Sequence, residues 1–274
     1  MSRIKELFSK KASRVLNVYC TAGYPQLEST LTIMRALQSA GADIIELGMP
    51  YSDPLADGPV IQASGLHALE NGMTIAVLFE QLRNFRSSFT PSVQGTPLEG
   101  DAGGDEAISI PVILMGYMNP VLQYGFEKFC ADAAAVGIDG LILPDLPQHE
   151  FETEYGAIIK EYGLDFIFLV TPETSDARIK ELDALSSGFL YAVSSSSTTG
   201  KDKDFGAVEA YLQKLQGLHL TNPVLVGFGI KDKQTFDAAC RHANGAIIGT
   251  AYIKALEGAE DIKVATKAFL NGIV

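Results

Sequence analysis

Residues 43–59, DIIELGMPYSDPLADGP, contain three successive signals of local structure. The first six residues form a short, nearly continuous apolar run, which is typical of a parallel strand covered on both faces. A loop stiffened by prolines follows, and Pro59 fits the first position of a helix, which makes Gly58 its N-cap. The stretch therefore predicts a strand, a loop and a helix in that order.

Seven similar apolar runs lie on either side of this stretch. They are VLNVYCT (15–21), PVILMGY (111–117), GLILP (140–144), FIFLV (166–170), GFLYAV (188–193), PVLVGFG (223–229) and AIIGT (246–250). Apolar residues at helical spacing predict helices over residues 27–40, 120–136, 149–162, 176–185, 205–216 and 231–242. Glycines at positions 41, 137 and 163 separate a helical pattern from an apolar run, which suits the left-handed residue that ends a helix.

Eight strands that alternate with helices predict an α/β fold, a single (β/α)8 TIM barrel that spans residues 1–274 and carries an extra N-terminal helix. A doubly wound open sheet is the alternative. That fold usually shows a G-x-G-x-x-G turn after its first strand, and CTAGYPQ (20–26) is not one. In a barrel, the loops after the C-terminal ends of the strands form the reactive face.

Residues 91–107, PSVQGTPLEGDAGGDEA, are rich in glycine and acidic residues and contain no basic residue. They predict a flexible acidic insertion before the third strand. This position is the N-terminal end of the barrel, away from the expected chemistry, so a surface insertion is favoured over a partner-docking loop.

The formal net charge of −12 disfavours nucleic acid and anionic membrane surfaces as partners. An anionic ligand must therefore be held by local groups. No stretch approaches the roughly 18 apolar residues of a membrane span, and the first residues lack the apolar segment of a secretion signal, so we expect a cytoplasmic protein.

The cysteines and histidines show neither the number nor the spacing of a disulfide framework or a metal site, so we expect no metal. They are Cys20, Cys130, Cys240, His67, His149, His219 and His242. A catalytic role for Cys20 is conceivable, but a small apolar residue inside a strand is the favoured interpretation.

Acidic residues lie at the C-terminal end of the second strand and in the loop after it. Counting by twos places Glu46 on the same side as Ile44 and Gly48, and burial inside the barrel would raise its pKa and suit a group that takes and gives a proton. An ion pair in the barrel mouth is the alternative for Glu46. Asp57 is free to face a ligand, because Pro59 argues against a capping role, whereas Asp53 fits an ordinary Asp-Pro turn.

Three late loops on the same face could hold a phosphate. They are residues 194–200 (SSSSTTG), residues 227–229 (GFG) and Gly249-Thr250, which we expect to open the last helix. Glycines let backbone amides approach an anion, hydroxyls add donors, and a helix N-terminus favours negative charge. Taken alone, Thr250 would more often be a plain N-cap, but three such loops at strands six to eight of a barrel are more specific.

Tyrosines 19, 117 and 191 lie at or near the ends of strands one, three and six, where their rings could line a pocket for a flat apolar ligand. Core filling is the alternative for each of them, and Phe228 is ambiguous in the same way.

These residues resemble the tryptophan synthase alpha subunit family. ELGMPYSDPLADGPVIQ (46–62) is similar to its signature, and CTAGYP, LMGYMNP, GLILPDLP, TTG, VGFGI and GAIIGTAYI resemble its other loop motifs in the same order. The resemblance implies a lyase that cleaves indole-3-glycerol phosphate into indole and glyceraldehyde 3-phosphate in a retro-aldol step. It implies that Glu46 shuttles the protons and that Asp57 contacts the indole N–H.

The resemblance also implies the ligand contacts. The phosphate would lie on Thr199, Gly200, Phe228, Gly229, Gly249 and Thr250, and the indole side would be surrounded by Tyr19, Tyr117 and Tyr191. The implied partner is a pyridoxal-phosphate β subunit in an α2β2 heterotetramer, docked around residues 50–57 and 118–120. The chain itself would need no cofactor.

Several positions depart from the family pattern. Members commonly have Phe where this chain has Tyr19 and Tyr51, and Gly-Val where it has Ser197-Thr198, which could restrict the phosphate loop. The acidic insertion is also longer than expected. The competing functions are another phosphate-binding barrel enzyme, such as a phosphoribosylanthranilate isomerase or a phosphosugar aldolase, and a barrel that only activates a β subunit without catalysis.

Overall fold

The computed structural model describes residues 1–87, 106–193, 205–227 and 229–274, with only the backbone of residues 205–207. Within these ranges, nine assigned strands form one sheet in the order β5-β4-β3-β2-β1-β9-β8-β7-β6, and all neighbours are parallel. The strands are β1 (Val15–Thr21), β2 (Ile44–Gly48), β3 (Val112–Met115), β4 (Gly140–Ile142), β5 (Asp165–Phe166), β6 (Leu169–Val170), β7 (Leu190–Val193), β8 (Val224–Gly227) and β9 (Gly245–Ile248). Each of the eight predicted apolar runs contains a strand.

The two outer strands of this order, β5 and β6, belong to one continuous segment. The backbone N–H of Ile167 donates to the carbonyl of Leu141 in β4 (3.0 Å), and the carbonyl of Phe168 accepts from the N–H of Tyr191 in β7 (3.0 Å). Because consecutive residues bond to opposite edges of the sheet, the sheet closes on itself. The predicted (β/α)8 barrel is confirmed, and the open doubly wound sheet is excluded.

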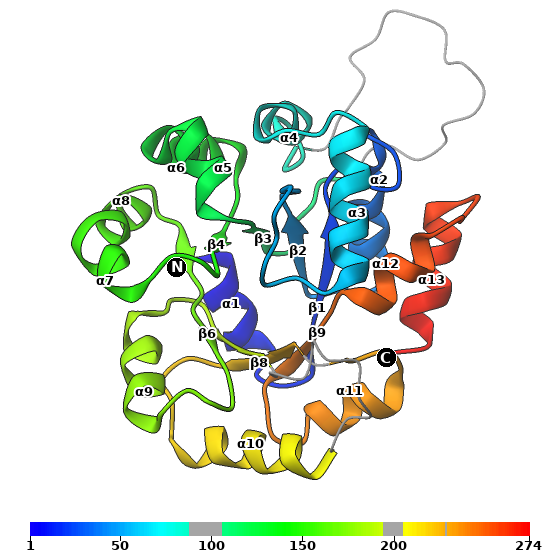
Figure 1. The fold of residues 1–274 in the computed structure, drawn as a ribbon. Helices are drawn as coiled ribbons and strands as arrows, with labels where there is room; N and C mark the ends of the chain where they lie inside the picture. The colour runs from blue at the N-terminus through cyan, green and yellow to red at the C-terminus, as the bar shows by residue number, and fades with distance from the viewer. Residues whose placement is uncertain (88–105, 194–204, 228) are drawn as a thin grey trace, which may run out of the picture.

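Helices surround the barrel, as Figure 1 shows. They are α1 (Arg3–Lys10), α2 (Ser29–Ser39), α3 (Pro59–Glu70), α4 (Ile75–Leu82), α5 (Met118–Tyr124), α6 (Phe126–Val136), α7 (Gln148–Glu150), a π-helical turn (Phe151–Tyr155), α8 (Gly156–Glu161), α9 (Asp176–Leu185), α10 (Phe205–Gly217), α11 (Lys233–Ala239), α12 (Thr250–Leu256) and α13 (Ile262–Asn271). The N-terminal helix is present, and α3 begins with Pro59 after the N-cap Gly58, as predicted.

Three helix predictions need correction. The single helix expected over residues 120–136 is two helices, α5 and α6, because Gly125 has a φ of +95° and interrupts the helical backbone. The segment expected as an α-helix over residues 149–162 contains a π-helical turn. Thr250 opens α12, which is not the last helix, because α13 follows it; the N-cap is Gly249.

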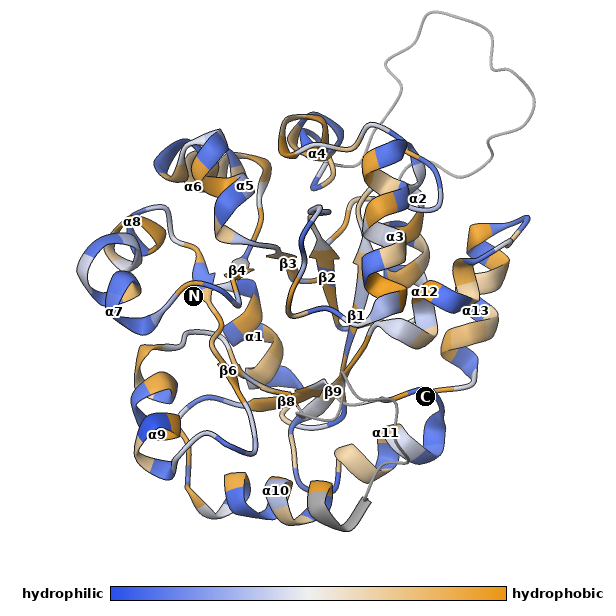
Figure 2. Cartoon of the chain, in the orientation of Figure 1, coloured by the Kyte–Doolittle hydropathy of each residue, from blue (hydrophilic) through white to orange (hydrophobic). Residues whose placement is uncertain are grey.

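Two apolar layers hold the barrel together. Ile44, Ile113, Ile142 and other alternate strand residues form an inner cluster, and the opposite faces of the strands pack against the surrounding helices. In Figure 2 the strands are mostly hydrophobic, whereas helices such as α3 and α10 carry hydrophilic colour as well. Ile4 of α1 is fully buried in the inner cluster, and in Figure 1 α1 lies inside the ring of helices. Helix α1 therefore fills the N-terminal end of the barrel.

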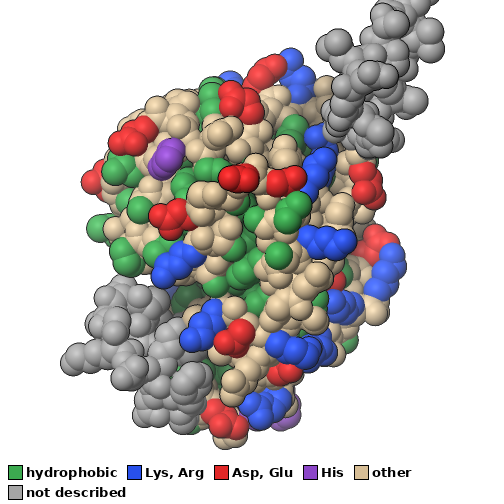
Figure 3. Space-filling view, turned by 90° about the vertical axis from the view of Figure 1, so that its right-hand side faces the viewer, with side chains coloured by type: hydrophobic (Ala, Val, Ile, Leu, Met, Phe, Trp, Pro, Cys, Tyr) green, Lys and Arg blue, Asp and Glu red, His purple; other side chains and the backbone are tan. Residues whose placement is uncertain are grey.

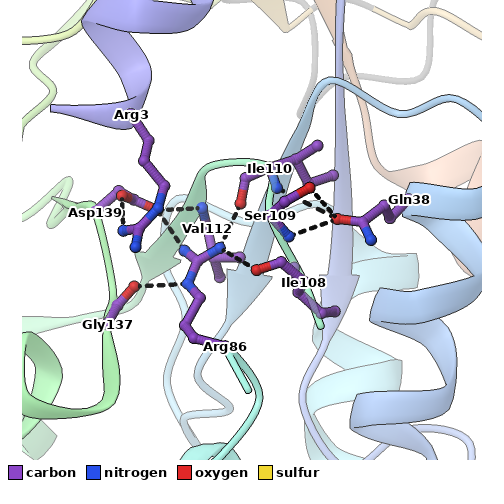
Figure 4. A network of polar contacts seen from close by, with 9 residues as sticks. All are labelled: Arg3, Gln38, Arg86, Ile108, Ser109, Ile110, Val112, Gly137 and Asp139. Carbon is purple, nitrogen blue, oxygen red and sulfur yellow. Dashed lines mark hydrogen bonds and ion pairs between the residues drawn. The ribbon is translucent and has the colours of Figure 1, made fainter. Parts of the chain in front are cut away.

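A polar network also lies at this end (Figure 4). The carboxylate of Asp139 accepts hydrogen bonds from Arg3, from Arg86 and from the backbone N–H of Val112. Arg86 also donates to the carbonyls of Gly137, Ile108 and Ile110. The network ties α1 to the start of β3 and to residues on both sides of the predicted acidic insertion. Of that insertion, only Glu106 and Ala107 lie within the described residues.

The described helices include none long and apolar enough to cross a membrane. On the face shown in Figure 3, Lys and Arg side chains lie among Asp and Glu side chains.

The described residues contain no group of three or more His, Cys, Asp or Glu that could hold a metal ion. Cys20 and Cys130 are buried free thiols, and burial raises the pKa of the Cys130 thiol to about 12, in line with a structural role.

Candidate active site

A cavity of about 160 Å³ lies at the C-terminal ends of the strands, the face on which barrel enzymes carry their chemistry. Seven strands contribute to its lining, together with the loop before α3, Ile61 of α3 and Thr250, the first residue of α12. Among the predicted site residues, the lining includes Tyr19, Glu46, Asp57, Tyr191, Gly229, Gly249 and Thr250. The cavity thus brings together predicted site residues from five strands and the loops that follow them.

Glu46 is the buried acid of the cavity. Its side chain is only 1% exposed, and its place on β2 follows from the alternation of the strand, which turns Ile44 into the same barrel interior. Burial raises the pKa of Glu46 to about 8, and the nearby carboxylate of Asp57 adds to the shift. A hydrogen bond from Asn17 opposes it. Glu46 is therefore mostly protonated at neutral pH and can serve as an acid before it serves as a base.

Asp57 is half-buried at the end of the loop between β2 and α3. Its Oδ2 atom accepts a 3.0 Å hydrogen bond from the hydroxyl of Tyr117. Burial raises the pKa of Asp57 to about 6, and this hydrogen bond opposes the rise because it stabilises the charged form. At neutral pH the site thus holds one neutral and one ionised carboxyl group, an arrangement that separates their chemical roles.

Hydrogen bonds to neighbouring elements hold the loop that carries Asp57. The side chain of Gln62, on α3, donates to the carbonyl of Asp57 (2.8 Å), and the N–H of Ala56 donates to the Tyr117 hydroxyl (3.0 Å). On the outer side, the Asn119 amide donates to the hydroxyl of Tyr51 (3.0 Å). These contacts join the loop to α3 and to the start of α5.

Two glycines make room for the two tyrosines that line the cavity. A Cβ atom on Gly48 would lie 2.1 Å from the hydroxyl oxygen of Tyr19, and one on Gly227 would lie 2.2 Å from a ring carbon of Tyr191. Each ring therefore crosses a neighbouring strand at a point without a side chain. Tyr117 does not line the cavity; it lies behind Asp57, with its ring 5.4 Å from that of Tyr51.

The predicted phosphate residues are only partly described. Gly229, Gly249 and Thr250 lie together on one side of the cavity, at the ends of β8 and β9. Thr199, Gly200 and Phe228 lie outside the described residues, as does the rest of the loop over residues 194–200. The roles of all these residues stay predictions.

Two groups of residues were not identified from the sequence. One is Asn17, which donates a hydrogen bond to Glu46; counting by twos back from Tyr19 places it in the barrel interior and could have found it. The other is the apolar wall of the cavity, formed by Ile61, Met115, Leu169, Val193, Ile230 and Ile247. Such residues carry no local signal that separates them from the core.

A second, apolar crevice of about 380 Å³ lies between α10 and α11 and shares Gly229 and Ile230 with the cavity. Its rim carries Glu209 and His242, and Nε2 of His242 lies 3.4 Å from Oε1 of Glu209. It contains neither of the two acids with raised pKa values, and groups of that kind mark functional sites. The cavity that holds Glu46 and Asp57 is therefore the candidate active site.

Comparison with known proteins gives one family over nearly the whole chain. The sequence profile described as "Tryptophan synthase alpha chain" matches residues 6–94 and 101–271. The tryptophan synthase alpha chain of Flavobacterium johnsoniae is 49% identical over 257 residues, which cover 93% of this chain and 94% of the relative.

Solved structures agree. Tryptophan synthase subunit alpha from Legionella pneumophila matches with a TM-score of 0.84 and 32% identity, over 100% of this chain and 97% of that chain. A chain of the tryptophan synthase complex from Pyrococcus furiosus matches with a TM-score of 0.79 and 32% identity, over 94% and 97% of the two chains. The chain therefore belongs to the tryptophan synthase alpha chain family and performs its reaction, the aldolase-type cleavage of indole-3-glycerol phosphate into indole and glyceraldehyde 3-phosphate.

Proposed function

We propose that Glu46 is the acid–base group of this cleavage. The observation that carries the proposal is a buried carboxyl group in the cavity wall, whose pKa of about 8 keeps a proton available at neutral pH. A carboxyl group at an ordinary pKa would be ionised there and could not begin as an acid.

In the proposed sequence, Glu46 first gives its proton to C3 of the indole ring, which places a positive charge on the ring nitrogen. The carboxylate that remains takes the proton of the side-chain hydroxyl. The bond between C3 and the side chain breaks, its electrons restore the neutral indole, and the hydroxyl carbon becomes the aldehyde of glyceraldehyde 3-phosphate. Glu46 ends protonated, as it began, so the step balances without another reactant.

Asp57 is proposed to stabilise the positive charge on the ring nitrogen. Its pKa of about 6 leaves it mostly ionised at neutral pH, and its Tyr117 hydrogen bond fixes the position of the carboxylate. A fixed negative charge in a partly desolvated site favours a cationic intermediate over the neutral substrate.

The phosphate is proposed to lie near Gly229, Gly249 and Thr250, with Thr199, Gly200 and Phe228 completing its site. The first residues of a helix have backbone N–H groups without acceptors inside the helix, and Thr250 and Ala251 hold these positions in α12. The indole ring would then lie between Tyr19 and Tyr191, with Tyr117 behind Asp57. This orientation spans the cavity from the phosphate loops to the two acids.

We further propose that the chain acts in an α2β2 heterotetramer with a β subunit that carries pyridoxal phosphate, and that it works in the cytoplasm without a cofactor of its own. The proposed docking surface is residues 50–57 and 118–120. Leu55 supports it, because this large apolar side chain is 91% exposed beside the site. Proton transfer by a carboxyl group also requires no cofactor.

The experiment is indole release from indole-3-glycerol phosphate by the purified chain, with and without a tryptophan synthase β subunit. Slow release that the β subunit accelerates supports both the residue roles and the partnership. A Leu55→Asp variant should lose the acceleration and keep the slow basal rate. Fast release that the β subunit leaves unchanged contradicts the partnership, and no release in either condition contradicts the proposed catalytic roles.

A further inference from the structure

Asn17 is a fully buried polar residue on β1, inside the barrel. Its Nδ2 atom donates a 2.8 Å hydrogen bond to Oε2 of Glu46 on the neighbouring strand. The register of the two strands pairs Asn17 with Ile44 and Tyr19 with Glu46, so the amide approaches the carboxyl group diagonally across the sheet. Two strands thus fix the position of the bond.

The other oxygen atoms of this pair have no partner among the described residues. Oδ1 of Asn17 and Oε1 of Glu46 are both buried and accept no hydrogen bond there. An unpartnered amide oxygen in an apolar interior is costly, and a leucine of similar size would avoid that cost. Core packing alone therefore does not account for an asparagine at this position.

The hydrogen bond also selects which oxygen of Glu46 carries the proton. An amide N–H group can donate but cannot accept, so Oε2 must present a lone pair to it. When Glu46 is neutral, this bond favours the proton on Oε1, because the carbonyl oxygen of a carboxyl group accepts a hydrogen bond better than its hydroxyl oxygen. When Glu46 is ionised, the same bond stabilises the negative charge.

We propose that Asn17 is a positioning residue for Glu46: it holds Oε2 and leaves Oε1 as the oxygen that exchanges protons with the substrate. This proposal rests on the proposed role of Glu46. Asn17 makes no proton transfer itself; it sets the orientation of the carboxyl group and eases its ionisation, which occurs in the first half of the reaction, when Glu46 gives its proton to the substrate.

The test follows the ionisation of Glu46 directly. The infrared carbonyl band of the protonated carboxyl group is recorded over a range of pH, and the spectrum of Glu46→Gln serves as the blank. Asn17→Leu removes the hydrogen-bond donor. The pH at which half of Glu46 is ionised, the midpoint of the titration, should therefore rise by about one to two pH units, the equivalent of one hydrogen bond to a charged group. In Asn17→Asp, which keeps the shape of the residue, a second acid should raise the midpoint further.

Thr266→Val is the matched control. Its hydroxyl makes a buried 2.7 Å hydrogen bond with Tyr252, between α13 and α12, and does not touch Glu46. The other titratable groups that face Glu46, namely Tyr19, Cys20, Asp57 and Tyr191, are present in every variant. The control should therefore lose stability and keep the wild-type midpoint.

Indole release provides the second readout. Asn17→Leu should lower kcat about tenfold, which corresponds to the loss of one such bond in the transition state, and should change KM less than twofold. An unchanged midpoint in both Asn17 variants overturns the positioning role. If the midpoint rises in the Asn17 variants but the wild-type protein releases no indole, the positioning of Glu46 is upheld and its proposed catalytic role is contradicted.

Discussion

The hydroxyl of Tyr117 lies 3.0 Å from Oδ2 of Asp57 and 3.0 Å from the backbone nitrogen of Ala56. One phenol therefore holds both the carboxylate and the loop that carries it. Burial also raises the pKa of Tyr117, so the hydroxyl stays protonated at every pH at which the site works. This contact makes the ionisation of Asp57 depend on a residue 60 positions away along the chain.

Tyr117→Phe should move the acidic limb of the pH–activity profile to higher pH. The hydrogen bond lowers the pKa of Asp57, which is about 6, so its loss raises that pKa and demands a higher pH for ionisation. The measurement is kcat/KM for indole release from pH 5 to 9. Tyr51→Phe removes a neighbouring hydroxyl that does not contact Asp57 and should leave the limb in place. An unmoved limb in Tyr117→Phe would show that Asp57 is not the group that sets it.

Glu46→Gln should reduce indole release by roughly 10²- to 10⁴-fold, the usual contribution of general acid–base catalysis. Glutamine keeps the size of the side chain and cannot transfer the proton. Binding of glyceraldehyde 3-phosphate, measured by calorimetry, should stay within about twofold of the wild type, because the phosphate side of the site is unchanged. Turnover near the wild-type rate would refute the role of Glu46.

The same variant should change how stability depends on pH. The pKa of Glu46 is raised from 4.5 in the unfolded chain to about 8 in the folded one. The folded state therefore keeps a proton that the unfolded state releases, and its stability falls as pH rises from about 4.5 to about 8. Thermal unfolding should show that the stability of Glu46→Gln relative to the wild type increases as pH rises across this window. Parallel curves for the two proteins would contradict the raised pKa.

Asp57→Asn should lower kcat by about 10²- to 10³-fold, by analogy with the loss of one fixed electrostatic contact. The amide keeps the shape of the carboxylate and lacks the charge that stabilises a cationic ring. Because the charge matters most in the transition state, KM should change much less than kcat. Steady-state kinetics test the split; a loss confined to KM would assign Asp57 to substrate binding alone.

Asp139→Asn should reduce stability by about 3 kcal/mol and leave kcat unchanged. The substitution removes the charge that faces Arg86, which is largely buried at the N-terminal end of the barrel, opposite the cavity. Urea unfolding and indole release measure the two effects. Asp132→Asn, which breaks an exposed ion pair with Lys128, should cost much less, because water screens the two charges. An equal loss in both variants would show that burial of the Asp139 pair has no special weight.

The sequence predicted the barrel because apolar runs and glycines at positions such as 41 and 137 are local signals. It did not predict the break at Gly125, since a single glycine inside a helical pattern is often tolerated. It also did not identify α4 or α13.

The active site was also predicted only in part: its two acids were found, but the hydrogen bonds that hold them were not. The position of Glu46 followed from the alternation of one strand, and Asp57 followed from its place before Pro59. The bonds from Asn17 to Glu46 and from Tyr117 to Asp57 join residues on separate elements. Such pairs depend on strand register and loop path, which are set by the folded chain as a whole.

The pairing of β1 with β9, in which Val15 lies beside Gly245, has a consequence for synthesis on the ribosome. The first strand leaves the ribosome long before its partner. The growing chain therefore holds an incomplete barrel, in which the edge of β1 that will pair with β9 has no neighbouring strand. Packing of helix α1 is also delayed, because Phe8 can pack against Phe189 only after Phe189 has left the ribosome. A nascent chain of this protein should therefore need protection from aggregation until its last strand is free.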